Sequence, residues 1–267
     1  LLDRLLSRAD PSGTEWPAAA SAAGYLAWLQ DDFAAALQLA DRAFACPSAS
    51  VAARAMALGV RSRALGDQGD FAGARCAALR SATLYDGEGD AWGATWSRRC
   101  AATAALFLGD TVTAEAEAIA CLDTYRTLAD SWGQAGTLDQ LASITHRRGD
   151  HRRALELAEQ AVALHRTLGD ASGLRYALQH HAEAAGASGD RALACRCAGE
   201  SLSLARVHGY RVGVLQALVL LAELAVDGVG SRDAGGHARE ALVLAGELGD
   251  DAAAARARAV LTSVGAD

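Results

Sequence analysis

Apolar residues run along the chain in segments of helical length, and a Gly-Asp step separates each segment from the next. The step recurs at a constant spacing, at Gly69-Asp70, Gly109-Asp110, Gly149-Asp150 and Gly189-Asp190. Half-period copies lie between them, at Gly89-Asp90, Gly169-Asp170 and Gly249-Asp250, with Ala129-Asp130 and Gly209-Tyr210 as variants. A turn signal about every 20 residues between helical segments is typical of a helix-turn-helix solenoid.

The recurring Gly-Asp step is best explained as helix punctuation. Glycine ends a helix in the left-handed conformation, and the aspartate that follows caps the exposed amides of the next helix. We therefore interpret Asp70, Asp110, Asp150 and Asp190 as structural residues and not as parts of a phosphate cradle.

Small residues recur at fixed distances from the turns. One aligned position in the second helix of each pair holds Ala36, Ala74, Ala114, Ala154, Ala194 and Ala234, and four residues later stand Ala40, Ala78, Ala118, Ala158, Ala198 and Ala238. A third position is Ala43, Ser81, Cys121, Ala161, Ser201 and Ala241, and the first helices contribute Gly24, Ser62, Ala102, Ala142, Ala182 and Ala222. Small residues in such a stripe let paired helices approach closely. The pattern predicts an all-α fold of about six helix pairs.

These features resemble the tetratricopeptide repeat. The resemblance rests on a small residue in the first helix, the turn Gly69-Asp70-Phe71, the alanine that follows it and a small residue further into the second helix, and it covers about residues 15–248. The usual period of that family is about 34 residues, so the period of about 40 residues in this chain implies longer helices. The large aromatic residues of the first helix are mostly Leu and Ala here, and the terminal proline is absent. The resemblance implies a right-handed α-solenoid.

The two ends of the chain differ from the repeats. We expect residues 1–10, with Leu1, Leu2, Leu5 and Leu6 on one helical face, to be the remnant of a preceding helix. Residues 250–264 carry one apolar face and are predicted to form a capping helix, which a solenoid needs at its open end. The turn at 227–230 lacks the Gly-Asp step. We expect residues 1–267 to form a single solenoid domain, and the absence of an initiator Met suggests a piece of a longer protein.

Composition argues against several classes of function. The net charge of -7 gives no concentrated positive face for nucleic acid. The chain has no Lys, so a Walker-A nucleotide site is excluded from it. The longest apolar run, 212–226, contains Gln216 and Glu223 and is too polar to span a membrane. We expect the six cysteines to be reduced, buried residues of a cytoplasmic protein.

No catalytic or metal-binding constellation stands out. His180 and His181 are adjacent and diverge on a helix, and Cys195 and Cys197 point to different sides, so we expect no metal site. The one acid–base pair near enough to consider is Asp139 with His146, two helical turns apart and about 10.5 Å in rise. We therefore expect no enzyme activity and no cofactor.

A second resemblance concerns function. Trp92-Gly93 and Trp132-Gly133 open first helices, Gly173 and Gly213 keep the glycine at the same position of the following repeats, and Leu168-Gly169-Asp170 precedes one such helix. This pattern of Trp-Gly, Gly and Leu-Gly-Asp positions is similar to that of the carboxy-terminal repeat region of large bacterial ATP-binding (STAND-type) transcriptional regulators of the LuxR and antibiotic-regulatory-protein types. The resemblance implies a sensor or protein-interaction module in signal transduction, whose ATP-binding and DNA-binding domains lie outside the repeats. A stand-alone scaffold for protein assembly is the alternative.

The family resemblance also implies a binding surface. In tetratricopeptide arrays the first helices line a concave groove, and projecting the family's groove positions gives Trp96, Arg99, Thr103, Asp139, Ser143, His146, Arg147, Tyr176, Gln179, His180, Glu183, Gln216 and Glu223. A mixed-charge, aromatic-containing lining suits a peptide, a protein segment or a polar small-molecule effector. An ordinary solvated face is the competing interpretation of the same residues.

Overall fold

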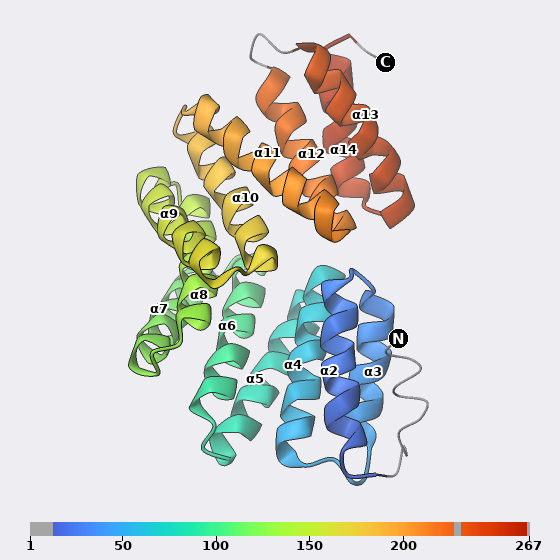
Figure 1. The fold of residues 1–267 in the computed structure, drawn as a ribbon, viewed down its shortest axis with the longest axis vertical. Helices are drawn as coiled ribbons and strands as arrows, with labels where there is room; N and C mark the ends of the chain where they lie inside the picture. The colour runs from blue at the N-terminus through green and yellow to red at the C-terminus, as the bar shows by residue number, and fades with distance from the viewer. Residues whose placement is uncertain (1–12, 227–230, 266–267) are drawn as a thin grey trace. The chain divides into compact units, whose positions relative to one another are not determined.

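The computed structural model describes residues 13–226 and 231–265, and within these ranges the protein is helical throughout. Thirteen helices follow one another there (Figure 1), and the connections that the structure describes are short. They are α2 (Trp16–Leu29), α3 (Phe33–Ala45), α4 (Val51–Asp67), α5 (Phe71–Gly87), α6 (Ala91–Phe107), α7 (Thr111–Thr127), α8 (Ser131–Arg147), α9 (His151–Leu168), α10 (Ala171–Ala187), α11 (Arg191–His208), α12 (Arg211–Val226), α13 (Ser231–Leu248) and α14 (Asp251–Ser263). The expected all-α solenoid of helix pairs is confirmed. The right hand of the solenoid and its number of repeats stay predictions.

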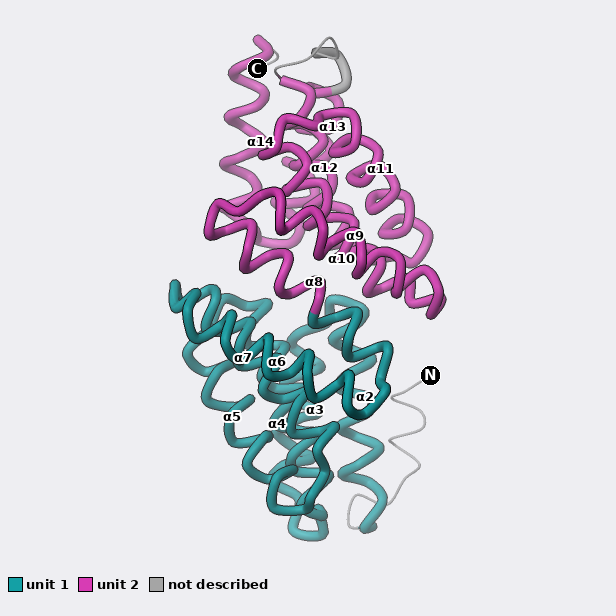
Figure 2. Tube along the Cα trace, turned by 90° about the vertical axis from the view of Figure 1, so that its left-hand side faces the viewer, with its two compact units in different colours: residues 1–137 teal, residues 138–267 magenta. Residues whose placement is uncertain are grey.

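The chain divides into two compact units, residues 1–137 and 138–267, with the division inside α8 (Figure 2). In unit 1 each helix from α2 to α7 contacts its neighbours in sequence, and the first helices of successive pairs also contact one another, α2 with α4 and α4 with α6. Unit 2 repeats this arrangement, with α10 against α12 and α12 against α14. Such nearest-neighbour packing is what defines a solenoid.

Helix α14 takes the place of a further first helix. It packs on both α12 and α13, and Val260 and Leu261 join the buried cluster formed by Ala222, Ala234 and Ala238. A helix does form over the range predicted for the cap. The predicted helix remnant at 1–10 and the turn at 227–230 lie outside the described residues.

The turns have the predicted chemistry. Gly69, Gly109, Gly149 and Gly189 have φ values of +85°, +87°, +87° and +86°, which is left-handed backbone. The aspartate after each one accepts a hydrogen bond from an amide three residues on, as Asp70 does from Gly73 (2.9 Å) and Asp190 from Leu193 (2.9 Å). The interpretation of the Gly-Asp steps as helix ends and caps is therefore confirmed.

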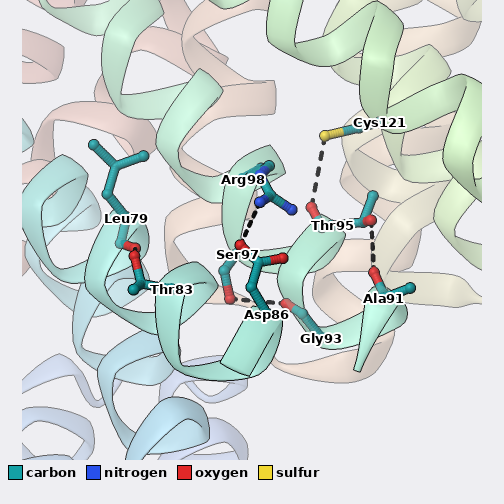
Figure 3. Close-up of polar contacts among 9 residues, drawn as sticks. All are labelled: Leu79, Thr83, Asp86, Ala91, Gly93, Thr95, Ser97, Arg98 and Cys121. Atoms are coloured by element: carbon teal, nitrogen blue, oxygen red, sulfur yellow. Dashed lines mark hydrogen bonds and ion pairs between the residues drawn. The ribbon is translucent and has the colours of Figure 1, made fainter. Parts of the chain in front are cut away.

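Small residues hold the helices of a pair close together. The six aligned alanines from Ala36 to Ala234 are at most 2% exposed. Where the third small position carries a donor, it binds a backbone carbonyl of the partner first helix: Ser81 binds that of Ala55 (2.6 Å), Cys121 that of Thr95 (3.6 Å) and Ser201 that of Arg175 (3.1 Å). Figure 3 shows the Cys121 contact between α7 and α6. Burial raises the pKa of Cys121 to about 11, so this cysteine is a structural thiol.

Polar side chains elsewhere in α5 and α6 are satisfied locally. Thr95 and Ser97 donate to the carbonyls of Ala91 and Gly93, one turn earlier in the same helix (Figure 3). Arg98 pairs with Asp86 across the two helices. These contacts need no ligand to account for them.

The glycines near the start of the first helices make room for aromatic rings. A Cβ on Gly93 would lie 2.6 Å from the ring of Tyr85, one on Gly133 would lie 2.2 Å from Tyr125, and one on Gly173 would lie 2.1 Å from His165. Each ring comes from the preceding second helix, eight residues earlier. The recurrence of these glycines once per repeat is thus a packing requirement.

The expectation for the cysteines is only partly correct. All six are free, and Cys46, Cys100, Cys121 and Cys197 are buried, but Cys76 and Cys195 are exposed. Both exposed residues lie on second helices, at positions that the small-residue stripe does not include.

Candidate functional site

A polar contact between two first helices joins α8 to α10 in unit 2. Nδ1 of His180 lies 2.7 Å from Oδ1 of Asp139, and the side chains are 24% and 13% exposed. Burial alone disfavours the imidazolium, but the charge of Asp139 and its hydrogen bond outweigh burial and raise the pKa of His180 to about 9. At neutral pH the contact is therefore an ion pair.

Glu183 extends this pair by one turn along α10. Its Oε1 accepts a hydrogen bond from Nε2 of Gln179 (3.1 Å), and its charge raises the pKa of His180 and opposes the lowering of the pKa of His146. Burial is the main reason that the pKa of His146 is lowered, and His151, 3.2 Å away between the Nδ1 atoms, adds to the effect. The charge of Glu183 thus acts on two histidines whose pKa values are shifted in opposite directions, upward for His180 and downward for His146.

A second ion pair continues the row toward the end of the chain. Nε and Nη2 of Arg256 on α14 donate to the two carboxylate oxygens of Glu223 on α12, at 2.8 and 2.7 Å. These bonds are the main cause of the raised pKa of Arg256, and the charge of Glu183 contributes as well. We call Asp139, His180, Glu183, Glu223 and Arg256 the polar row of unit 2.

Two predicted residues of unit 2 surround a buried arginine. Tyr176 stacks against the guanidinium of Arg175, with 3.8 Å from Cζ to the ring centroid. Gln216, on α12, places Oε1 3.5 Å from Nη1 of the same arginine. Ser143 is half-buried and Arg147 is exposed.

The three predicted residues of unit 1 differ among themselves. Trp96 is 2% exposed and packs against Gly59 and Tyr25, so it belongs to the core. Arg99 lies 5.6 Å from the ring centroid of Trp132 and 3.5 Å from the carbonyl of Gly136. Thr103 is exposed and donates to the carbonyl of Arg99 in its own helix.

The sequence prediction missed an aromatic cluster on the earlier first helices of unit 1. Arg63 on α4 lies 3.9 Å above the ring of Trp28, and Tyr25 lies 5.5 Å from Trp28 between ring centroids. Only 5% of the chain is aromatic, so two such residues in one predicted first helix were an available signal. The projection of the family's groove positions had started at the third helix pair.

The Asp139–His180 pair was also missed. The two residues are 41 positions apart, about one repeat, and the prediction considered only partners on one helix, such as His146. Because successive first helices lie side by side, residues about one period apart are the ones to compare.

Two further findings concern sites that are absent from the described residues. Within 13–226 and 231–265, no group of three His, Cys, Asp or Glu residues could hold a metal ion. Among the helices described there, none combines the length and the apolar character needed to cross a membrane.

The resemblance of this chain to known proteins is one of fold, and it is found among solved structures. No family model matches the chain, and no curated protein does so either. Among solved structures, a Rap protein complexed with the competence and sporulation factor has a TM-score of 0.71 at 11% identity, over 98% of this chain and 77% of the other. The apo form of the quorum sensor NprR from B. thuringiensis has a TM-score of 0.61 at 14% identity, over 97% and 72%.

A third similar structure is a signal-transduction ATPase with numerous domains (STAND protein) from Pyrococcus horikoshii, which carries a tetratricopeptide-repeat sensor. Its TM-score is 0.64 at 13% identity, and the match covers all of this chain but 41% of the ATPase. At such identities the likeness concerns the fold alone. The chain therefore has the fold of a tetratricopeptide-like helical solenoid.

Proposed function

We propose that this chain is a sensor and protein-interaction module that binds a peptide or protein segment along the polar row of unit 2. The observation that carries the proposal is the Asp139–His180 ion pair with Glu183 beside it. These charges link two first helices at low exposure, where Ala and Leu would pack the solenoid at lower cost in desolvation. A row of both charge signs suits a polar polypeptide, and a small polar effector is the alternative ligand.

We further propose that the module regulates a larger cytoplasmic bacterial transcriptional activator that binds ATP. Support comes from the sequence resemblance described above. It also comes from two structurally similar proteins, a quorum sensor and a STAND ATPase with a repeat sensor. Ligand binding would favour one conformation of the solenoid and so shift the population of active regulator. The six free cysteines fit a cytoplasmic location.

The parent open reading frame tests the regulatory context. A Walker-A motif upstream and a helix-turn-helix at either end support the regulator. A reading frame without either motif would contradict it and favour the stand-alone scaffold.

The binding surface is tested by selection from a random peptide library displayed on phage, using the whole chain as bait. Enriched peptides are then measured by calorimetry against wild type, Glu183→Lys and Glu200→Lys. Glu200 is the matched control, because it is a half-exposed glutamate in an ion pair with Arg166 on the second helices of the same unit.

We expect Glu183→Lys to weaken peptide binding about tenfold or more, since it reverses a charge within the row. Glu200→Lys should leave the affinity unchanged. Peptides that bind both variants as tightly as wild type would show that the polar row is not the binding surface.

A further inference from the structure

Among the residues that the structure describes, Arg175 is a buried arginine without a carboxylate partner. The residue is 3% exposed, and its Nε has no hydrogen-bond partner in the described part of the chain. Its Nη1 makes a 3.5 Å contact with Oε1 of Gln216, which is at the limit for a hydrogen bond. A guanidinium has five N–H donors and keeps its charge at all relevant pH values. Within the described residues, Nε therefore lacks a partner and Nη1 has only a weak one.

The surroundings of Arg175 are built to hold the guanidinium flat. Tyr176 lies on one side at 3.8 Å from Cζ to the ring centroid, and the centroid of Tyr210 is 5.4 Å away. A Cβ on Gly213 would come within 2.7 Å of both Cδ and Nη1. The Arg175 side chain thus occupies a defined space at the α10–α12 contact.

That space is the one filled by an aromatic ring in the earlier helix pairs. Tyr85, Tyr125 and His165 each lie over the glycine eight residues later, but the equivalent residue before Gly213 is Ala205. Arg175 fills the vacated volume. Its own equivalents are Ala55, Thr95, Ala135 and Leu215, which are uncharged.

Filling a gap in a helical core with a charged side chain is energetically unfavourable, because the charge loses its hydration. An unpaired buried ion costs several kcal/mol, and an apolar residue of similar volume packs the same space with no such penalty. Arginine is the side chain best suited to grip a carboxylate through two parallel hydrogen bonds. The unpartnered Nε and the weakly bonded Nη1 lie near the side chain of Gln216, which is exposed.

We propose that Arg175, with Gln216 and the two tyrosines, is the receptor for a carboxylate group of the bound peptide, either an acidic side chain or the C-terminus. The proposal rests on the proposed peptide-binding function and names one chemical group in the ligand. The weak contact with Gln216 is replaced by a charge-assisted pair when the carboxylate enters. The tyrosine rings keep the guanidinium in the plane that the carboxylate needs.

The test uses NMR of the whole chain, observing the Arg175 Nε–H signal. The probes are the peptide acetyl-Ala-Glu-Ala-amide, its Gln counterpart, glutarate and inorganic phosphate, each added at constant ionic strength. We expect the Glu peptide or glutarate to shift the signal in a saturable way, and the Gln peptide to have no effect. Stronger binding by the Glu peptide identifies a polypeptide carboxylate, and stronger binding by glutarate identifies a small carboxylate at the same site.

Arg175→Met supplies the matched variant, because it keeps most of the volume and removes the charge. It should be at least as stable as wild type and bind the Glu peptide about tenfold to a hundredfold more weakly, as measured by calorimetry. The Glu-against-Gln comparison on wild type decides the question if this variant does not fold. A response to phosphate alone, equal responses to Glu and Gln peptides, or unchanged binding by Arg175→Met would overturn the proposal.

The failure of this proposal can be distinguished from the failure of the proposed function. Selected peptides that depend on Glu183 but bind without a carboxylate would refute the Arg175 site and leave the proposed function standing. If no peptide is selected, both proposals fail, and glutarate binding would then show that Arg175 binds a small carboxylate instead.

Discussion

At the scale of the residue, Gly173 shows how one missing side chain sets the distance between helices. The ring of His165 lies where a Cβ would be, and its Nδ1 is 3.0 Å from Oδ2 of Asp170, the cap of α10. One glycine therefore accommodates both the ring and its hydrogen-bond partner. The cap and the packing of neighbouring helices depend on each other here.

Gly173→Ala should lower the free energy of unfolding by about 1–3 kcal/mol, because the added methyl group collides with a buried ring. Gly199→Ala is the matched control. Gly199 lies inside α11, and a Cβ there would have no neighbour within 4 Å. That change should be neutral or raise stability by up to about 1 kcal/mol through helix propensity. Urea denaturation of both variants is the measurement, and equal destabilisation by the two would refute the packing argument.

At the scale of the element, the Asp139–His180 pair fastens α8 to α10 in a pH-dependent way. The folded protein raises the pKa of His180 from 6.5 to about 9, so the folded state binds a proton that the unfolded state releases between these values. The stabilisation is complete below about pH 6.5 and is lost as the pH rises through about 9.

His180→Gln should therefore remove part of the fall in stability on the alkaline side, as measured by urea denaturation from about pH 6 to about pH 9.5. His181→Gln is the control, because the pKa of this adjacent histidine is shifted in the opposite direction. Burial lowers the pKa of His181, so its contribution is present above the unfolded value and is lost as the pH falls. A pH profile of His180→Gln that parallels wild type would contradict the ion pair.

The sequence predicts local features of the elements better than contacts between them. The Gly-Asp turns, the caps and the small-residue stripe each depend on a few residues of one repeat, and periodicity reveals them. The partner of Asp139 depends on which residues of α10 face α8, which the pattern of one helix cannot tell. The burial of Arg175 depends jointly on Ala205 and Gly213, in two other helices. That coincidence is visible only when all three are in place.

At the scale of the whole molecule, nearest-neighbour packing means that removing one helix destabilises mainly the helices in contact with it. The apolar face of α14, with Ala253, Ala254 and Ala257, covers a cluster that includes Leu215 and Leu218 of α12. Uncovering that cluster leaves its neighbours exposed to water, but it removes no contact within unit 1.

A chain ending at Gly249 should therefore lose amide protection in α12 and α13 and keep it in α2 to α6. Hydrogen–deuterium exchange read out by mass spectrometry measures this directly. A chain lacking only residues 265–267 serves as the control, because it keeps Val264, which packs against the buried cluster, and it should exchange like wild type. Loss of protection spread evenly over all helices would contradict one-dimensional stability.

The glycine that recurs near the start of the first helices also bears on how such a chain evolves. Because Gly93, Gly133, Gly173 and Gly213 recur once per repeat, a duplication or loss of one whole repeat in register leaves each ring facing a glycine. Duplication or loss of a repeat can thus lengthen or shorten the protein without requiring a new type of helix contact. The exchange of a ring for Ala205, with Arg175 in its place, marks one copy as no longer interchangeable with the others.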